Sequence, residues 1–344
     1  MKVLLASDQF LTDEVLREAI TQELPDVELA AISSTWPVPP FHDVAEVKEA
    51  HGDEDELIEA LQGCEVAFSH TFPFTEKVIK NSPDLKMITI CRGGPVNANI
   101  EAATANGVLV SYTPGRNATA TAEHTVGLIV ASARQITQRH IEVVNGDWRS
   151  DYYKFENVGP EIGSSTVGVI GYGNVGRKVA NIIAAFGGRV LVFDPWSKDR
   201  NGPDNLEFVE TLEDLLRNSN IVTIHARATE ENIQMMNADA FALMPKNSIF
   251  VNCARGSLVD YEALADAIDS GHLFAAGLDC LPEEPLPADH RLISTPRVTI
   301  TPHLGGASKE ASRLAARIGA ADIAAFAKGD KPKYVANPEV FERE

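Results

Sequence analysis

Short apolar runs alternate with amphipathic stretches along the whole chain. The run 3–6 is followed by the stretch 13–24, in which Leu16, Ala19 and Ile20 fall on one helical face. Further apolar runs of strand length occupy 66–68, 87–90, 166–170, 189–193, 221–224, 248–252, 275–279 and 298–300, and helical patterns occupy 75–81, 212–217, 239–243 and 307–328. Strands that alternate with helices in this way predict an α/β fold with doubly wound parallel sheets.

Three regions depart from this alternation. Residues 118 to about 144 have the pattern of one long apolar helix, and 151–160 have too little periodicity for a core element, which makes them a candidate dimer arm. Residues 34–56 predict an irregular excursion followed by a polar helix, to which we assign no function. A chain of 344 residues favours two domains, and the turn cluster at 113–117 marks the expected change between them.

The chain passes from the predicted buried strand at 166–170 directly into a glycine turn and then a helix. Gly171 permits a tight turn, Gly173 lets the backbone approach a pyrophosphate, and Gly176 lets the helix pack closely on its strand. The free N–H groups at the helix start would then face phosphate oxygens. The expected phosphate-binding residues are Gly171, Gly173, Asn174, Val175 and Gly176.

The next apolar strand, 189–193, ends in Asp194. A carboxylate at this place can accept hydrogen bonds from both hydroxyls of the adenosine ribose and would repel a 2′-phosphate, so NAD is favoured over NADP. The alternative is an ordinary strand–helix–strand turn with a surface aspartate. The order of strand, glycines, helix, second strand and acid favours the dinucleotide site.

Three candidate catalytic side chains follow three successive predicted strands, namely Arg255, Glu284 and His303. The carboxyl ends of parallel strands share one edge of a sheet, so we expect these side chains to face the same crevice. Histidine suits proton transfer near neutral pH, a carboxylate can fix its tautomer, and a guanidinium can hold a substrate carboxylate. Each residue alone has an ordinary alternative as a turn histidine, a solvated acid or a surface arginine. Their combination downstream of a dinucleotide site favours hydride-transfer chemistry.

Composition and charge limit the classes of partner and the cellular compartment that we expect. A formal net charge of −19 argues against nucleic acid and anionic membranes as partners. No stretch approaches about 18 consecutive apolar residues, and the first apolar run is too short for a signal peptide, so a cytoplasmic location is expected. The four cysteines are scattered and lack metal-ligand spacing, so neither a disulfide framework nor a metal site is expected.

A second candidate anion site follows the predicted strand at 87–90. Arg92 can pair with an anion there, and the adjacent Gly93 and Gly94 can expose backbone N–H groups to it. A tight turn with a surface arginine is the alternative interpretation. The loop is therefore a candidate substrate-binding element.

Together these motifs resemble the D-isomer-specific 2-hydroxyacid dehydrogenase family, and the similarity covers nearly the whole chain. The resemblance rests on the glycine turn 171–176, the Arg-Gly pair 255–256, the D-x-x-x-x-E-P segment 279–285 and the P-H-x-G-G turn 302–306. The segments 113–118 and 146–148 resemble the 3-phosphoglycerate dehydrogenase branch in particular. The chain stops at Glu344, so the regulatory domain that some members of this branch carry is not expected.

The resemblance implies two doubly wound domains with the active site in the cleft between them. A Rossmann domain at 113–305 would bind NAD and carry the dimerisation helix and arm of a homodimer. A flavodoxin-like substrate-binding domain would combine 1–112 with 306–344. By the same resemblance Arg255, Glu284 and His303 are catalytic, and Arg92, Gly93 and Gly94 bind the substrate. The further cofactor-binding residues implied are Asp194, His225, Cys253, Asp279 and Gly305.

The predicted activity is hydride transfer between NAD(H) and a D-2-hydroxy acid/2-oxo acid pair, with a 3-phosphoglycerate-like or a hydroxypyruvate- or glyoxylate-like substrate. The alternative is a non-catalytic NAD-sensing protein of the corepressor kind, which has no need for the complete set of three catalytic residues. Two departures from the family pattern bear on the site. Pro95 lacks an N–H in the substrate loop, and Arg227 adds a cation where the family frequently has proline.

Overall fold

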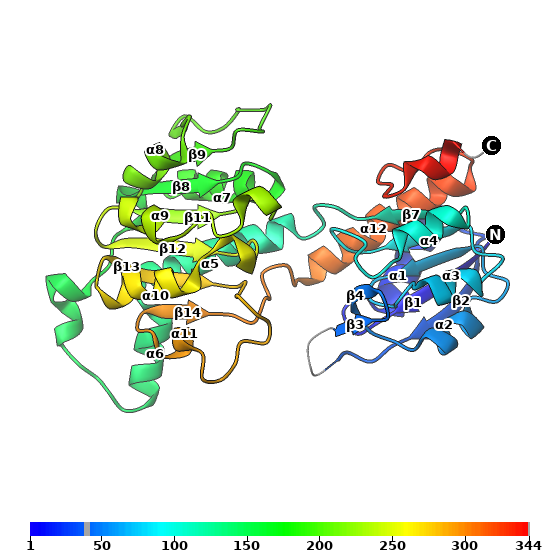
Figure 1. Cartoon of the computed structure of the whole chain (residues 1–344), viewed down its shortest axis with the longest axis horizontal. Coiled ribbons are helices and arrows are strands. Elements are labelled where there is room, and N and C mark those ends of the chain that lie inside the picture. Colours follow the sequence, from blue (N-terminus) through cyan, green and yellow to red (C-terminus); the bar gives the residue numbers. More distant parts are fainter. Residues whose placement is uncertain (38–41, 343–344) are drawn as a thin grey trace. The chain divides into compact units, whose positions relative to one another are not determined.

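The computed structural model describes residues 1–37 and 42–342, and it divides into two compact units (Figure 1). Unit 1 consists of Met1–Asn117 and Ala307–Glu344, and unit 2 is Ala118–Gly306. The expected domain segments ended at 112 and 305. In the part of the chain that the structure describes, no helix has both the length and the apolar character needed to cross a bilayer.

Unit 1 is built on a five-stranded parallel sheet with the order β2-β1-β5-β6-β7. Ranked along the chain this is the 2-1-3-4-5 order of flavodoxin-like folds, as expected. Its strands are β1 (Lys2–Ser7), β2 (Glu28–Ser33), β5 (Val66–Ser69), β6 (Met87–Ile90) and β7 (Leu109–Tyr112), and its helices are α1 (Asp13–Glu23), α2 (Glu54–Ala60), α3 (Glu76–Lys80), α4 (Ile100–Ala105) and α12 (Lys309–Ala327).

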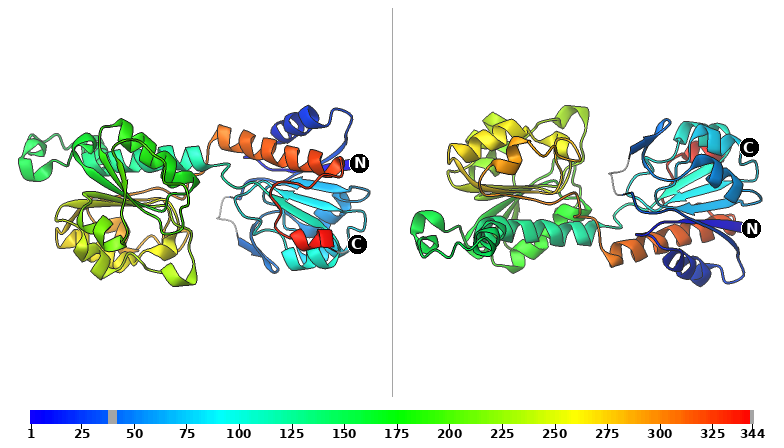
Figure 2. Two further views of the ribbon diagram at one scale, coloured as in Figure 1. Left: turned by 90° about the horizontal axis from the view of Figure 1, so that it is seen from above. Right: turned by 90° about the horizontal axis from the view of Figure 1, so that it is seen from below.

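Helices cover both faces of this sheet (Figure 2). Val3 and Leu5 of β1 pack with α1 and α12, whereas Leu4 and Ala6 point to the core beneath α2, α3 and α4. Because successive side chains of a strand point to opposite faces, a sheet buried on both sides has an uninterrupted apolar run, which is the pattern of 3–6.

Unit 2 is built on a seven-stranded parallel sheet with the order β10-β9-β8-β11-β12-β13-β14, the Rossmann order with one further edge strand. Its strands are β8 (Thr166–Ile170), β9 (Arg189–Phe193), β10 (Leu206–Phe208), β11 (Ile221–Ile224), β12 (Ser248–Asn252), β13 (Leu273–Leu278) and β14 (Val298–Ile300). Its longer helices are α5 (Ala118–Arg134), α6 (Ile136–Val144), α7 (Asn174–Ala185), α8 (Leu212–Arg217), α9 (Ala238–Leu243) and α10 (Tyr261–Asp269), and α11 (Arg291–Ser294) is a single turn. Helices α5 and α7 cover one face, and α8, α9 and α10 cover the other (Figure 2). The expected α/β fold with two doubly wound sheets is confirmed.

The prediction of one helix from 118 to 144 is wrong, because the chain breaks at Gln135. This residue has a left-handed backbone with φ +55°, so the α-helical hydrogen-bond ladder ends at Arg134 and a new helix starts at Ile136. The Gln135 side chain donates from Nε2 to the carbonyl of Ser132 at 2.8 Å, which satisfies one of the last acceptors of α5.

The prediction of an irregular excursion at 34–56 is also wrong in part. A short antiparallel hairpin forms from β3 (His42–Val44) and β4 (Val47–Ala50), and residues 38–41 of the excursion lie outside the described chain. Val47 and Ala50 are buried, and Lys48 N–H donates to the carbonyl of Val96. The polar helix follows at Glu54, where Asp53 caps it by accepting from two backbone N–H groups.

Candidate active site

The glycine turn connects β8 to α7. Gly171 has φ +92°, and a Cβ on Gly176 would lie 1.9 Å from the Gly171 carbonyl oxygen, so both positions need glycine. A Cβ on Gly173 would meet nothing within 4 Å, and Gly173 and Asn174 are exposed while Val175 is half-buried. Gly173 is the N-cap of α7 and supplies no side-chain acceptor. The first N–H groups of α7 are thus left for an anionic ligand, which fits a dinucleotide pyrophosphate.

Asp194 lies beside this turn because β9 pairs in parallel with β8. Its Oδ2 accepts from the N–H of Tyr172 at 2.7 Å, and its Oδ1 accepts from the N–H of Trp196 at 2.9 Å. Each carboxylate oxygen can accept a further hydrogen bond. Within 1–37 and 42–342 no basic side chain forms an ion pair with Asp194. The carboxylate is therefore oriented by backbone and remains available to a ribose diol.

His303 and Glu284 form a close pair, with 2.7 Å between Nδ1 and Oε2. The Cys280 sulfur, 3.7 Å from His303 Nε2, and the Glu284 carboxylate together raise the pKa of His303 to about 10. Burial opposes ionisation of Glu284, but the hydrogen bond and the charge of His303 outweigh it and lower the pKa of that carboxyl. The N–H of Leu281 also donates to Glu284 Oε1 at 3.1 Å. Glu284 thus fixes one imidazole nitrogen and leaves Nε2 as the proton-carrying atom.

Asp279 holds the turn that carries His303. Its Oδ1 accepts from Thr301 Oγ1 at 2.7 Å and from the N–H of Leu304 at 2.8 Å, and its Oδ2 accepts from the N–H of Gly305 at 2.8 Å. His303 has φ +53°, which non-glycine residues rarely adopt, so these bonds stabilise a strained backbone. A Cβ on Gly305 would lie 2.7 Å from Asp279 Oδ2, so glycine permits this close approach.

His124 on α5 supports the same turn and is not among the predicted site residues. Its Nε2 lies 2.9 Å from Thr301 Oγ1 and 3.2 Å from Asp279 Oδ1. His124 and Thr301 are 177 positions apart in the chain. A histidine near the start of an apolar helix was the only sequence signal, and it does not identify such a partner.

Arg255 follows β12 and is exposed. Its Nη1 donates to the carbonyl of Ala254 at 2.7 Å. A Cβ on Gly256 would lie 1.8 Å from the Leu281 carbonyl oxygen, so glycine lets this turn contact the segment that leads to Glu284. After the larger effects of burial and of His303, the charge of Arg255 also lowers the pKa of Glu284. The three predicted catalytic side chains therefore come together at the carboxyl edge of one sheet.

Two expected cofactor-binding residues lie deeper in unit 2. His225 Nε2 is 3.1 Å from Thr223 Oγ1, and its Nδ1 is buried without a hydrogen-bond partner among the described residues. Burial lowers the pKa of His225 to about 3, so its ring is neutral at physiological pH. Cys253 is buried as well, and burial raises the pKa of its thiol. Arg227, in contrast, is exposed.

The predicted substrate loop follows β6 in unit 1. Arg92 pairs with the carboxylate of Glu49 and donates to the Glu49 carbonyl at 2.8 Å. A Cβ on Gly93 or on Gly94 would meet nothing within 4 Å, so the loop backbone is open on that side. A substrate anion at Arg92 would have to share the guanidinium with Glu49.

A polar cluster at the same edge of the unit 1 sheet is absent from the predictions. Asp8 follows β1, His70 follows β5 and Arg116 follows β7; Asp8 Oδ2 lies 2.8 Å from His70 Nδ1, and His70 Nε2 lies 3.5 Å from Arg116 Nη2. Burial lowers the pKa of His70 despite the nearby Asp8, so a neutral imidazole donates to Asp8 and accepts from Arg116. Asp8 and His70 come directly after apolar strands, which was a signal in the sequence, whereas Arg116 lies four positions beyond the end of β7.

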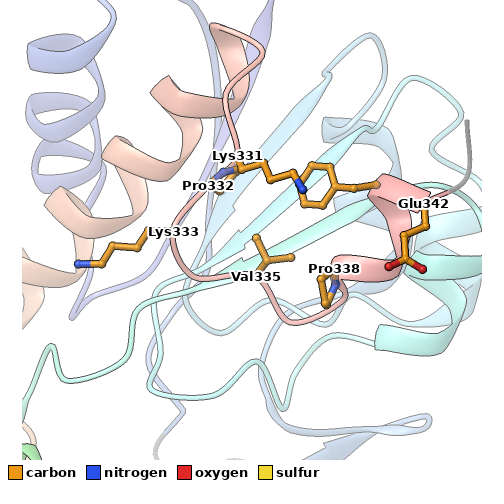
Figure 3. A pocket seen from close by; sticks show the side chains of 7 residues that line it. Lys331, Pro332, Lys333, Val335, Pro338 and Glu342 are labelled. Atoms are coloured by element: carbon orange, nitrogen blue, oxygen red, sulfur yellow. The ribbon is translucent and has the colours of Figure 1, made fainter.

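A shallow cavity in unit 1 is lined by none of the candidate site residues (Figure 3). It measures about 390 Å³ and is formed by the C-terminal segment of unit 1, including Lys331, Lys333, Val335 and Phe341. Lys331 Nζ stands 5.0 Å from the centre of the Phe341 ring, so much of the lining is a cation–π contact within the segment itself. We assign this cavity no part in the chemistry.

Sequence comparison relates this chain to known proteins. Residues 126–305 match the family model described as D-isomer specific 2-hydroxyacid dehydrogenase, NAD binding domain. A glyoxylate reductase of Thermofilum pendens is 34% identical over 77% of this chain and 78% of its own length. A D-3-phosphoglycerate dehydrogenase of Methanocaldococcus jannaschii is 34% identical over 86% of this chain, which spans only 56% of that relative.

The fold comparison agrees with the sequence comparison. The structure of a D-lactate dehydrogenase with NAD⁺ from Lactobacillus jensenii has a TM-score of 0.78 and 25% identity, and it covers 98% of this chain and 99% of its own. The matched family domain binds NAD and contains the glycine turn, Asp194 and the three candidate catalytic residues. The chain belongs to the D-isomer specific 2-hydroxyacid dehydrogenase family.

Proposed function

We propose that this protein is an NAD-dependent dehydrogenase that interconverts a 2-oxo acid and a D-2-hydroxy acid. The observation that carries the proposal is the His303–Glu284 pair, in which a carboxylate 2.7 Å from Nδ1 directs the other imidazole nitrogen to the reaction. A protein that only senses NAD has no use for this pair. The pair therefore favours the enzyme over the corepressor-like alternative.

His303 is the proton donor in the direction of reduction. Its Nε2–H protonates the carbonyl oxygen of the 2-oxo acid, and Glu284 stabilises the imidazolium before the transfer and fixes the neutral tautomer after it. In the reverse direction neutral Nε2 accepts the proton of the hydroxyl group. NAD, when bound, supplies the hydride acceptor or donor.

Arg255 holds the substrate carboxylate through a planar pair of charge-assisted hydrogen bonds and polarises the neighbouring carbonyl. The backbone N–H groups of Gly93 and Gly94 and the side chain of Arg92 are the proposed contacts from unit 1. Asp194 hydrogen-bonds the ribose diol, so replacement of Asp194 by serine is expected to narrow the preference for NAD over NADP.

The substrate belongs to the group that includes glyoxylate, hydroxypyruvate and 3-phosphohydroxypyruvate. The names of the relatives support this range, since one is a glyoxylate reductase and another a D-3-phosphoglycerate dehydrogenase. The test is oxidation of NADH by the purified protein with each of these acids, with pyruvate and with branched 2-oxo acids. Turnover of one or more of them supports the proposal, and NADH binding without any turnover contradicts it.

The protein is further proposed to be a cytoplasmic homodimer. Support comes from α6 and the turns after it, which extend away from the body of unit 2 (Figure 1). No residue of α6 is buried, and Trp148, Tyr153 and Phe155 are 87%, 92% and 92% exposed. Apolar surface of this extent on one projecting segment is typical of an interface that a partner covers.

A further inference from the structure

Cys280 brings a third ligand-type side chain to the His303–Glu284 pair. Cys280 Sγ, Glu284 and His303 have ligand atoms within 4.8 Å of one another, and they form the only such group in the described ranges 1–37 and 42–342. The sulfur lies 3.7 Å from His303 Nε2, and its hydrogen is directed to the Ala254 carbonyl oxygen at 3.4 Å. The thiol therefore faces the atom that transfers the proton.

The spacing of sulfur and nitrogen suits a tetrahedral metal ion. Zinc–sulfur bonds of about 2.3 Å and zinc–nitrogen bonds of about 2.0–2.1 Å at a tetrahedral angle separate the two ligand atoms by roughly 3.5 Å. The observed 3.7 Å needs only a small movement of the half-exposed imidazole. Thiolate and imidazole are the ligands that zinc prefers, whereas magnesium and calcium prefer oxygen.

Glu284 completes the arrangement without itself binding the metal. Histidine ligands of zinc commonly donate their other ring N–H to a carboxylate, which orients the ring and raises its basicity. Glu284 Oε2 already occupies this position, 2.7 Å from Nδ1. The tautomer that this contact favours leaves the lone pair of Nε2 directed to the Cys280 side.

We propose that Cys280 and His303 form a reversible zinc site that inhibits the enzyme by occupying His303 Nε2. Zinc forms bonds to Sγ and to Nε2, the thiol proton and the Nε2 proton of the imidazolium both pass to solvent, and water fills the remaining positions. The binding site stands on this geometry alone, while the inhibition rests on the proposed role of His303. Two protein ligands give weaker binding than the four of a structural zinc site, so the ion acts as a removable inhibitor.

The binding test needs no substrate. Calorimetric titration of the metal-free wild-type protein with zinc chloride should give one site per chain at micromolar concentration, and magnesium chloride should give none. Cys280→Val and His303→Ala should each abolish that site. Cys64→Val is the matched control, because Cys64 is also a buried free thiol but lies in unit 1. Glu284→Gln should weaken zinc binding by about 10- to 100-fold, as expected for a carboxylate that orients a ligand.

An absorption spectrum with cobalt(II) and an inhibition assay form the second part of the test. Cobalt(II) should give a thiolate-to-metal charge-transfer absorption in the wild-type protein and in Cys64→Val but not in Cys280→Val. With an active substrate, zinc should inhibit the wild type reversibly with EDTA, and each variant is compared with its own metal-free rate. Zinc binding that survives Cys280→Val, or no zinc binding by the wild type, would overturn the proposal. Normal zinc binding with no turnover of any 2-oxo acid would reject the dehydrogenase function, but the zinc site itself would still be supported.

Discussion

At the scale of single residues, the account depends on His303 as the proton donor. General acid–base catalysis contributes about 10² to 10⁴ in rate, so His303→Ala should lower kcat for reduction by roughly that factor. The affinity for NADH should barely change, because the imidazole is assigned to the substrate. Steady-state kinetics and a fluorescence titration with NADH measure the two quantities separately. Near-normal turnover of His303→Ala would remove His303 from this role.

Cys280 and Glu284, which together raise the pKa of His303, are expected to set the pH range of the reaction. The pKa of His303 is raised to about 10, so the imidazolium is present at neutral pH and the rate of reduction should fall as the pH rises through about 10. Glu284→Gln removes the negative charge that favours the imidazolium, so the alkaline limb should move to lower pH. The pH profile of kcat/KM for reduction measures this shift. An unchanged profile would contradict the pairing.

Arg255 should act on substrate binding and on the transition state together. A charge-assisted hydrogen bond contributes about 1.5 to 3 kcal/mol, so Arg255→Ala should lower kcat/KM by roughly 10- to 150-fold. Arg255→Lys should recover little of this loss, because an ammonium group lacks the planar fork. Full recovery by lysine would show that charge alone suffices at this position.

At the scale of elements, two glycines of the β8–α7 turn are expected to have different roles. Gly176 is needed for packing, and Gly173 is needed for cofactor binding. A Cβ on Gly176 would meet the Gly171 carbonyl oxygen at 1.9 Å, so Gly176→Ala should cost about 1–3 kcal/mol of unfolding free energy. Gly173→Ala has open space, so it should leave the stability unchanged while its methyl group weakens NADH binding. Thermal unfolding and NADH titration of both variants test this contrast. Equal loss of stability in the two variants would contradict it.

The sequence predicted those elements whose pattern depends on local burial. The apolar run 166–170 became β8 and 189–193 became β9 because strands buried on both faces keep an apolar side chain at nearly every position. The break at Gln135 was not predictable, since a left-handed residue other than glycine has no distinct signature. The hairpin at β3 and β4 was missed because its strands are only three and four residues long.

The predicted site likewise contains residues that a general rule of sequence and topology identifies and contacts that it does not. Arg255, Glu284 and His303 were found because each follows a strand end of one sheet, a rule that topology makes general. The contacts of His124 with Thr301 and of Cys280 with His303 depend on side-chain directions in the folded chain, which spacing does not reveal. The pairing of Arg92 with Glu49 is of the same kind, because Glu49 lies on a hairpin that the sequence did not predict.

At the scale of the whole molecule, the exposed segment after α5 predicts self-association. Light scattering should report twice the 37.2 kDa chain mass. Phe155→Glu places a charge on the 92% exposed ring of this segment and should produce monomers, whereas Phe186→Glu alters a ring that is 50% exposed elsewhere on unit 2 and should leave the dimer intact. A wild-type protein that stays monomeric at micromolar concentration would contradict the dimer.

The measurement that tests the central claim most directly is NADH oxidation by the purified wild-type protein with a 2-oxo acid, followed by determination of the configuration of the product. The account predicts turnover with at least one acid of the glyoxylate, hydroxypyruvate and 3-phosphohydroxypyruvate group, and a D-2-hydroxy acid wherever the product is chiral. An L-configured product, or tight NADH binding with no turnover of any 2-oxo acid, would contradict it.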